Sequence, residues 1–256
     1  MVCDQFPMVR LIRNDRNTGF ATANNQGVMS SSGKYVLLLN SDTVVKPEAL
    51  THLVDFMDAH PEAGGAGSML LNPDETIQPS CFPFPTIPRE IWRLFHLDLI
   101  KVYGIYSMNG WDQNAVREVD HIQGASLVLR RETLDQVGLL DQDYFMYSEE
   151  LDLCYRIKKS NWKLYWVPKS RVVHYGGQST KQVAEKMFLE LYRSKVLFFR
   201  KNMPNAVLIY KLSLLAAALF RILLSPMVLI ERGKVRQFHL TRIKYYFRLI
   251  SALPRM

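Results

Sequence analysis

The feature that most constrains the fold is an unbroken apolar run at positions 35–39, with the sequence Tyr-Val-Leu-Leu-Leu. Such a run is typical of a strand buried on both faces, as in the middle of a parallel sheet. It ends abruptly at Asn40, Ser41 and Asp42. In open α/β sheets, ligands bind in the crevice at the carboxyl ends of the strands. Asp42 is therefore a candidate for holding a divalent metal against a phosphorylated ligand, although the same residues also serve as turn or helix-capping residues.

The size and composition indicate an ordinary folded protein. A chain of 256 residues can form one sizeable domain with an appendage, and 48% of its residues are apolar and 22% are charged. The three cysteines are isolated and show no zinc-binding spacing. A reducing compartment is therefore a better interpretation than a disulfide framework.

The formal net charge of +8 is concentrated near the C-terminus. Residues 1–206 carry equal numbers of basic and acidic side chains, and the excess lies in residues 207–256. The basic pI therefore describes the tail and not the body. Nucleic-acid binding by the folded domain is not indicated.

The N-terminal third begins with local patterns that allow two interpretations. Residues 8–12 alternate enough to predict a short strand, residues 17–19 suit a turn, and residues 20–28 suit a helix. A helix start aimed at the ends of the strands can bind phosphate with its free N–H groups. The small residues Ala21 and Ala23 also fit a closely packed turn without any ligand.

The middle of the chain alternates helical and strand patterns. An apolar stripe predicts a helix over residues 47–59, and apolar runs predict strands over 66–71 and 121–131. A short helix is expected from Glu132 to a stop at Gly138. Residues 79–118 are rich in proline and aromatic side chains, and they suit either a flap over an acceptor or an irregular packed connection.

A cluster of acids begins the next predicted helix. Ser148 is a plausible N-cap, and acids in a first turn complement the helix dipole. Helical spacing puts Glu149, Asp152 and Arg156 on one face. It puts Glu150 at the start of the apolar, inward-facing side, where a carboxylate could act as a general base. The alternative is that all these acids only favour the helix N-terminus.

Two short strands are predicted at residues 163–167 and 171–175, followed by a flexible loop over 176–179. His174 near the end of the second strand could complete a metal site with Asp42, because neutral imidazole is a nitrogen ligand. A single histidine on a strand is also often only packed or hydrogen-bonded.

The C-terminal region is apolar and then basic. Residues 206–230 are interrupted by Lys211 and Arg221, and Pro226 is expected to bend the segment. The uninterrupted pieces are shorter than the roughly 20 residues that a membrane span needs. Residues 235–250 have the pattern of a basic amphipathic helix that lies in the interface of an anionic cytoplasmic leaflet. The alternative is a helical pair packed on the body or on a second subunit.

Taken together, the motifs resemble the family 2 glycosyltransferases, which have the GT-A fold, and particularly their rhamnosyltransferase-like branch. The resemblance implies an α/β fold with a mixed, mainly parallel sheet flanked by helices. Five blocks in the family's order carry it: Arg13-Asn14 with Asn17-x-Gly19-Phe20-x-x-Ala23-Asn24-x-x-Gly27; Leu37-Leu38-Leu39-Asn40-Ser41-Asp42-Thr43; Gly124-Ala125; Glu149-Glu150-x-Asp152-Leu153-Cys154-x-Arg156; and Val167-Pro168 with His174-x-Gly176-Gly177-x-Ser179.

The resemblance also implies the roles of these residues. Asn40-Ser41-Asp42 looks like an Asp-x-Asp motif with its first acid replaced, so Asp42 and His174 are expected to bind Mg²⁺ or Mn²⁺. Glu150 matches the catalytic base of an enzyme that inverts the anomeric centre. The implied catalytic residues are Glu149, Glu150 and Asp152, and the implied donor-binding residues are Arg13, Asn17, Gly19, Phe20, Asn24, Asn40, Ser41, Asp42, Gly124 and Ala125.

Compared with the family pattern, the chain opens almost directly at the third strand. A strand-helix-strand unit of roughly 50 residues is expected to be missing. This predicts a truncated GT-A domain over residues 1–205 and a membrane-associated helical tail over 206–256, on the cytoplasmic side of the cell membrane.

The expected reaction joins a sugar from a nucleotide-sugar donor, with rhamnose on a deoxythymidine diphosphate as the first choice, to a glycan or lipid-linked acceptor for a cell-surface polysaccharide. Two alternatives remain at this point. One is an inactive, membrane-docked interaction module. The other is a nucleotidyltransferase, which would need a glycine-rich basic loop before Asp42 that the sequence does not contain.

Overall fold

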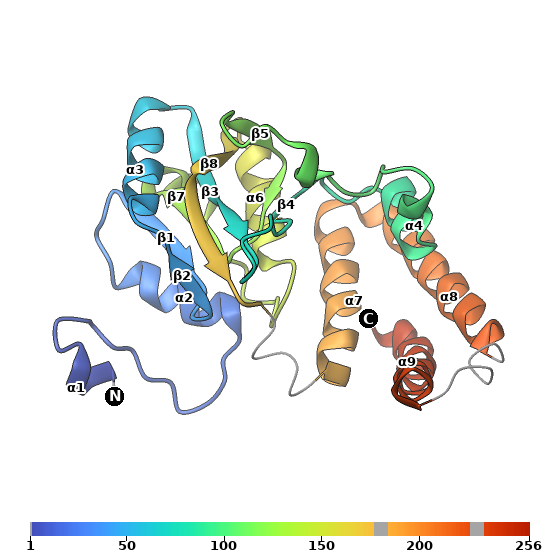
Figure 1. Cartoon of the computed structure of the whole chain (residues 1–256). Helices are drawn as coiled ribbons and strands as arrows, with labels where there is room; N and C mark the ends of the chain where they lie inside the picture. Colours follow the sequence, from blue (N-terminus) through green and yellow to red (C-terminus); the bar gives the residue numbers. More distant parts are fainter. Residues whose placement is uncertain (1, 177–183, 226–232) are drawn as a thin grey trace.

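The computed structural model describes residues 2–176, 184–225 and 233–256, with the side chains of residues 233–239 excepted. A sheet with helices on both faces forms one side of the molecule, and a group of helices forms the other (Figure 1). A short helix, α1 (Val2–Gln5), lies at the N-terminus beside an extended segment. The expected Gly177 and Ser179 of the last motif, and the bend at Pro226, lie outside the described residues.

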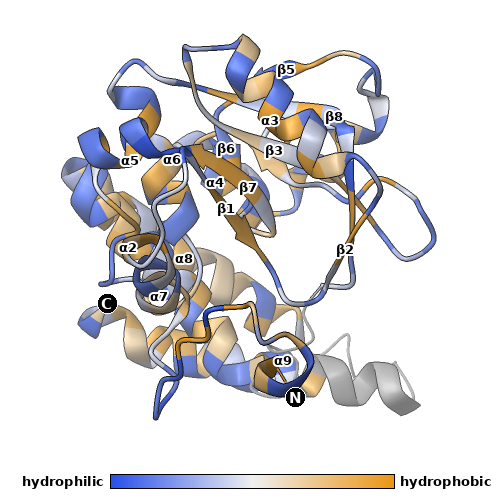
Figure 2. Ribbon diagram, turned by 90° about the vertical axis from the view of Figure 1, so that its left-hand side faces the viewer, coloured by the Kyte–Doolittle hydropathy of each residue, from blue (hydrophilic) through white to orange (hydrophobic). Residues whose placement is uncertain are grey.

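The main sheet has the strand order β1-β7-β3-β8-β2, and β5 pairs with β8. Its strands are β1 (Tyr35–Leu39), β2 (Thr43–Val45), β3 (Ala63–Leu71), β5 (Arg117–Val119), β7 (Ser126–Arg130) and β8 (Lys163–His174). A two-stranded sheet pairs β4 (Cys81–Phe82) with β6 (His121–Ile122). Figure 2 shows β1 and β7 in the centre as largely hydrophobic ribbon.

The expected mixed sheet flanked by helices is confirmed, but fewer of its pairs are parallel than expected. Within the described strands β3–β8 is the one parallel pair, and the pairs β1–β7, β3–β7, β2–β8 and β5–β8 are antiparallel. β1 and β3 run in the same direction, but β7 lies between them in the opposite direction. An unbroken apolar run indicates a strand that is buried on both faces, but it does not indicate the direction of that strand. The expected share of parallel strand pairs was therefore too high.

Helices cover both faces of this sheet. On one face α3 (Ala49–Ala59) packs its Leu53, Phe56 and Met57 against β3, β7 and β8. On the other face lie α2 (Phe20–Met29), α5 (Arg131–Val137) and α6 (Glu149–Lys159), which share the largest core cluster with the strands. β1 divides its residues between these layers in alternation, as a strand buried on both faces must.

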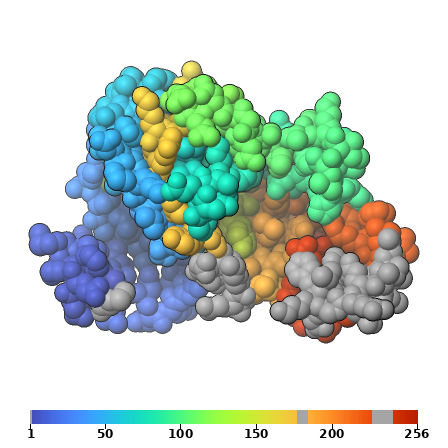
Figure 3. All heavy atoms as spheres, in the orientation of Figure 1, coloured from blue at the N-terminus to red at the C-terminus, as the bar shows by residue number. Residues whose placement is uncertain are grey.

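A second core joins the helices on the other side of the molecule. It contains residues of α4 (Ile87–Leu94), α7 (Ala184–Asn202), α8 (Val207–Leu223) and α9 (Gly233–Ala252). Figures 1 and 3 show the green segment that includes α4 lying against the orange α8. The division at residue 205 stays a prediction, since helices from both sides of it share this core. Short turns of 3-10 helix occur at η1 (Leu97–Leu99), η2 (Met108–Gly110), η4 (Pro204–Ala206) and η6 (Leu253–Arg255).

Three local expectations need correction. Residues 8–12 form no strand: they lack a pairing partner, and Met8 is 96% exposed. The two strands expected at 163–167 and 171–175 are one strand, β8, with an irregularity at residues 168–170, where proline cannot donate a ladder hydrogen bond. Residues 79–118 are more ordered than expected, because they contain β4, α4 and β5.

Candidate active site

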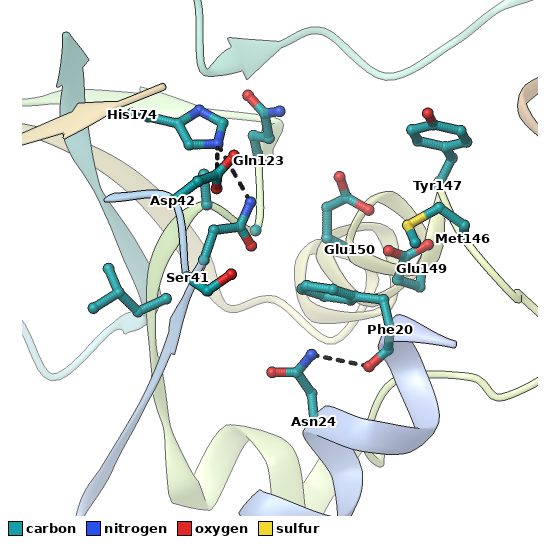
Figure 4. A pocket seen from close by; sticks show the side chains of 14 residues that line it. Phe20, Asn24, Ser41, Asp42, Gln123, Met146, Tyr147, Glu149, Glu150 and His174 are labelled. Carbon is teal, nitrogen blue, oxygen red and sulfur yellow. Dashed lines mark hydrogen bonds and ion pairs between the residues drawn. The ribbon is translucent and has the colours of Figure 1, made fainter. Parts of the chain in front are cut away.

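A cavity of about 360 Å³ opens where β1 ends and where α2 and α6 begin. Figure 4 shows Asp42 and His174 on one wall and Glu149 and Glu150 on the opposite wall, with open space between them. The lining residues are Phe20, Asn24, Leu39, Asn40, Ser41, Asp42, Gln123, Gly124, Ala125, Met146, Tyr147, Glu149, Glu150 and His174.

Antiparallel pairing explains why these distant segments meet. Since β7 runs antiparallel to β1, its start lies beside the end of β1, and the Asn40 N–H donates to the Ala125 carbonyl at 3.1 Å. Likewise β2 pairs with the end of β8, where Thr43 is opposite His174 and the Tyr175 N–H donates to the Asp42 carbonyl at 2.9 Å. The sheet register therefore brings Gly124, Ala125 and His174 to Asp42.

The start of α6 is held in an unusual backbone conformation. Tyr147 and Ser148 both lie in the left-handed region, with φ of 68° and 65°. Two consecutive non-glycine residues in this region are uncommon and costly, and such strain concentrates at functional sites. Ser148 occupies the expected N-cap position, but its side chain makes no capping hydrogen bond. The turn directs Glu149 and Glu150 together toward the cavity.

Both of these carboxyl groups are perturbed. Burial raises the pKa of Glu149 well above its usual range, and the nearby Glu150 and Glu190 raise it further. Burial also raises the pKa of Glu150, while the backbone N–H groups of Glu150 and Leu151 oppose that shift. In both residues Oε2 is buried and has no hydrogen-bond partner. Because the two carboxyl groups are close together, they titrate as a pair, and the pKa of each is raised.

Asp152, expected among the catalytic residues, does not line the cavity. Its carboxylate accepts from Arg156 Nε at 2.8 Å, from Asn202 Nδ2 at 3.0 Å and from the Tyr144 hydroxyl at 3.4 Å. The face that Glu149, Asp152 and Arg156 share lies against α7, and both acids are buried. Helical periodicity describes one helix alone, so it did not reveal this second covering layer.

His174 is oriented by a residue that the sequence reasoning missed. Gln78 donates from Nε2 to the Asn72 side chain and to the His174 carbonyl, which leaves its Oε1 to accept from His174 Nδ1 at 2.6 Å. This network assigns the proton to Nδ1, so Nε2 is the ring nitrogen that can accept a hydrogen bond or bind a metal. Nε2 lies 3.3 Å from Asp42 Oδ1 and 3.4 Å from Asn40 Nδ2. The pair therefore presents one nitrogen and one oxygen donor at the same point.

The charge around the cavity favours a bound cation. Asp42, Glu149 and Glu150 line it, whereas no lysine or arginine of the described chain does. Over the same residues, no group of three or more histidine, cysteine, aspartate or glutamate side chains could hold a metal ion by itself. Any ion here would take further ligands from water and substrate, as Mg²⁺ commonly does.

The turn before α2 has a shaping role. The Gly19 N–H donates to Asn17 Oδ1 at 3.0 Å, and Gly19 has a φ of +85°. Phe20 then faces Gly124, where an added Cβ would stand 3.4 Å from the Phe20 ring. Of the predicted donor-binding residues, the structure brings Phe20, Asn24, Asn40, Ser41, Asp42, Gly124 and Ala125 to the cavity. It leaves Arg13, Asn17 and Gly19 outside it.

Several lining residues were not expected from the sequence. Leu39, Gln123, Met146 and Tyr147 line the cavity, and Gln78 stands behind His174. Two of these residues directly precede predicted site residues: Leu39 comes before Asn40, and Gln123 before Gly124. Tyr147 lies two positions before Glu149. Nothing in the local pattern around Gln78 pointed to His174, which is 96 residues away.

Comparison with known proteins agrees with this geometry. Residues 1–94 match the model of glycosyl transferase family 2. The chain is also 29% identical over 196 residues to the N-acetylglucosaminyl-diphospho-decaprenol L-rhamnosyltransferase of Mycobacterium tuberculosis, covering 69% of this chain and 62% of the relative. Over these residues the chain is similar to the family 2 glycosyltransferases. A match to the rhamnosyltransferase WbbL of Escherichia coli, 26% identical over 66% of both chains, supports the rhamnosyltransferase-like branch of this family.

A solved structure supports a GT-A-like fold for this chain. The mannosyltransferase PcManGT from Pyrobaculum calidifontis, in complex with GDP-Man and Mn²⁺, superposes with a TM-score of 0.52 at 15% identity, covering 98% of this chain and 71% of that one. The chain spans 62% of the length of the mycobacterial relative.

Proposed function

We propose that this chain transfers a sugar from a nucleotide-diphosphate donor to an acceptor hydroxyl, with inversion at the anomeric carbon. The carrying observation is that Asp42 and Glu150, far apart in the chain, line opposite walls of one cavity (Figure 4). One wall suits the leaving diphosphate, and the other suits the attacking hydroxyl. Asn24, Ser41 and Gln123 supply polar side chains, and Gly124 and Ala125 allow close approach of the donor to the backbone.

Glu150 is the proposed base. A raised pKa brings a carboxylate closer to the operating pH, which favours general base catalysis. Its position in the first helical turn and the N–H groups of Glu150 and Leu151 stabilise the anion that a base requires. Burial and the adjacent Glu150 also raise the pKa of Glu149, so the two neighbouring carboxyl groups do not both ionise readily.

A divalent cation, Mg²⁺ or Mn²⁺, fits beside Asp42 and His174. The fit rests on the Nε2 lone pair that Gln78 leaves available, on its 3.3 Å distance from Asp42 Oδ1, and on the lack of basic side chains among the described lining residues. When bound, such an ion supplies charge neutralisation of the leaving diphosphate. The Pyrobaculum mannosyltransferase is in complex with GDP-Man and Mn²⁺, which is consistent with this proposal.

The proposed step is a single displacement. The acceptor oxygen forms a bond to the anomeric carbon while the bond from that carbon to the donor phosphate oxygen breaks. The electron pair of the broken bond stays on the diphosphate, and Glu150 takes the proton of the acceptor hydroxyl. Phe20 and Tyr147 line the cavity on the α2 and α6 sides.

Replacing Glu150 with Gln tests the base assignment. Donor binding, measured by titration of the nucleotide sugar, should stay within about twofold of wild type, while the transfer rate should fall by about 10² to 10⁴. The matched control is Glu132→Gln, the same change at an exposed position in the first turn of α5. Transfer by E150Q at the wild-type rate would eliminate Glu150 as the base, and a chain that binds no donor would reject the proposed function itself.

The finer assignments extend from the relatives. Rhamnose is the proposed sugar, because the mycobacterial and Escherichia coli relatives are both rhamnosyltransferases, and a polysaccharide precursor is the proposed product. No observation on the cavity favours a nucleotidyltransferase, since no basic side chain of the described residues lines it. A panel of nucleotide sugars, including deoxythymidine diphosphate rhamnose, tests the choice of donor.

Membrane association is proposed for the helical tail, on the cytoplasmic side. Among the described residues one helix, Pro204–Leu223, is long and apolar enough to cross a membrane by length and composition, with a mean hydropathy of 2.0. Lys211 and Arg221 lie within this helix and do not interrupt it, contrary to the expectation from the sequence. One stripe of α8, including Tyr210 and Leu214, packs on the protein, while Leu208, Ile209, Leu212 and Leu223 are exposed. This two-sided arrangement suits a helix that lies on a membrane surface.

A further inference from the structure

A second cavity of about 160 Å³ lies beside the active site, with Glu150 and Tyr147 in the walls of both. It is bounded by the loop after β4, by α4 and by α7. Its lining residues are Phe82, Pro83, Pro85, Arg89, Glu90, Arg93, Gly104, His121, Tyr147, Ser148, Glu150, Leu151, Leu191 and Lys195. Since a general base must reach the acceptor, a cavity that shares Glu150 with the proposed donor site is positioned for the acceptor.

The electrostatic character of this second cavity is opposite to that of the first. Arg89, Arg93 and Lys195 line it, and Glu90 is the one carboxylate that pairs with any of them in the described part of the chain. Lys195 Nζ lies 2.5 Å from Glu90 Oε2, and Arg93 Nη1 lies 3.8 Å from Glu90 Oε1. Arg89 has no carboxylate partner among these residues; its Nη1 donates to the Phe84 carbonyl at 2.9 Å. Counting Glu150 as well as Glu90, the three basic side chains leave the cavity with a net positive charge.

Polar atoms at this cavity also lack partners. Arg89 Nε and His121 Nε2 are buried and make no hydrogen bond. Burial, with the nearby Lys195 and Arg93, lowers the pKa of His121 to about 3, so its ring is neutral at physiological pH. Burying unpaired donors and surplus charge is costly, and a bound anion would relieve that cost. The cavity therefore combines space, excess positive charge and an unused N–H donor.

We propose that this second cavity binds a phosphate group of the acceptor, next to the sugar whose hydroxyl faces Glu150. The inference rests on the proposed function and adds the acceptor class, a sugar joined to its carrier through a phosphate ester. Arg89 and Arg93 are the recognition residues, because guanidinium groups bind phosphate oxygens through paired N–H donors. Lys195 adds charge from the α7 side while it stays paired with Glu90.

The segment that follows α4 lines the second cavity with Gly104 and carries exposed apolar side chains a few positions earlier. This segment folds back on α4, with Tyr103 against Trp92 at 5.7 Å between ring centroids, and presents Leu99 and Ile100 at 90% and 82% exposure. α4 also lies against α8 (Figures 1 and 3). The ring centroids of Phe95, just after α4, and Phe220 of α8 are 5.9 Å apart. A lipid tail that leaves the phosphate site would meet these exposed apolar side chains.

Binding of alkyl diphosphates to the full chain tests the proposal without any donor. Butyl diphosphate and farnesyl diphosphate are titrated calorimetrically in the presence of EDTA, so that no metal recruits them to Asp42. The wild-type chain should bind both. Arg93→Gln and Arg89→Gln should each weaken binding by about tenfold to a hundredfold, and Arg93→Lys should lose less than Arg93→Gln, because the charge is retained.

Two control variants locate the site. Arg200→Gln removes an exposed arginine from α7, the same helix that carries Lys195, and Asp42→Asn alters the proposed donor site. Both should bind the diphosphates within about twofold of wild type. The proposal is overturned if R93Q and R89Q bind as tightly as wild type while their melting temperatures show intact folding. It is equally overturned if D42N or R200Q weakens binding as much as they do.

The two probes distinguish the sources of the phosphate. Farnesyl diphosphate binding at least tenfold tighter than butyl diphosphate assigns the site to a lipid-linked acceptor, and equal affinities assign it to a soluble phosphorylated acceptor. A parallel titration with nucleotide sugar separates this inference from the proposed function. Loss of donor binding alone would reject the function, whereas loss of the arginine effect alone would reject the phosphate site.

Discussion

Replacing Gly19 with Ala tests whether the turn before α2 builds one wall of the cavity. Gly19 has φ 85° and ψ 169°, a region that residues other than glycine almost never adopt. An added Cβ would stand 2.6 Å from the Phe145 carbonyl oxygen, which also accepts the Phe20 N–H at 3.2 Å. The substitution must therefore shift the backbone on one side of this contact.

The expected cost is large for a single methyl group. Forcing alanine into this region costs about 1–3 kcal/mol, and disturbing the hydrogen bond from Phe20 adds about 1 kcal/mol. A loss of about 2–4 kcal/mol lowers the melting temperature of a chain of this size by roughly 5–15 °C. Because Phe20 and Asn24 line the cavity from α2, donor affinity should fall as well.

Gly27→Ala is the matched control. Gly27 lies in the same helix, α2, and an added Cβ there meets nothing within 4 Å. Alanine in a helix interior is favoured over glycine by about 0.5–1 kcal/mol, so G27A should melt slightly higher than wild type and bind donor normally. Thermal unfolding and a donor titration measure both effects. Equal melting temperatures for G19A and wild type, or equal losses in G19A and G27A, would refute the assigned role of Gly19.

Two further predictions concern the chemistry of the same cavity. Gln78→Leu should weaken Mn²⁺ binding in the presence of nucleotide by about 10–100-fold, because His174 loses the partner that fixes its tautomer. A paramagnetic titration measures the Mn²⁺ affinity. An unchanged affinity would exclude His174 as a metal ligand held by Gln78. Glu149→Gln should raise the melting temperature at neutral pH by a few degrees, and the gain should vanish below the unfolded pKa of 4.5. Since the pKa of Glu149 is raised in the folded state, folding favours its protonated form, and the stability of the wild-type chain falls as the pH rises. A gain in melting temperature that persists at pH 3 would contradict this prediction.

The local elements were largely predictable. The helices α2, α3 and α6, the strand β1 and the short helix α5 lie close to where apolar periodicity, glycine and proline placed them. The segment at residues 8–12 failed because alternation alone does not form a strand without a partner to hydrogen-bond. The direction of β7 also escaped prediction, since apolar runs look the same in parallel and antiparallel strands.

The site residues were predictable in part, and the structure shows why Asp152 was predicted wrongly. Asp42, His174 and Glu150 came from motif positions, and the structure brings all three to one cavity. Asp152 came from the same motif as Glu150, but its carboxylate contacts Arg156 and Asn202 and does not line the cavity. Adjacent positions on a helix point in different directions, and which of them meets open space depends on what packs around the helix.

The sequence alone determined where the apolar strands end in polar residues, where the acidic helix begins and which family the motifs resemble, because these features reside in short stretches of chain. Only the tertiary structure decided that α7 buries Glu149, that Gln78 orients His174, and that Arg89, Arg93 and Lys195 meet beside Glu150. These relations join residues up to about a hundred positions apart. They arise from strand register and helix packing, which depend on the whole chain at once.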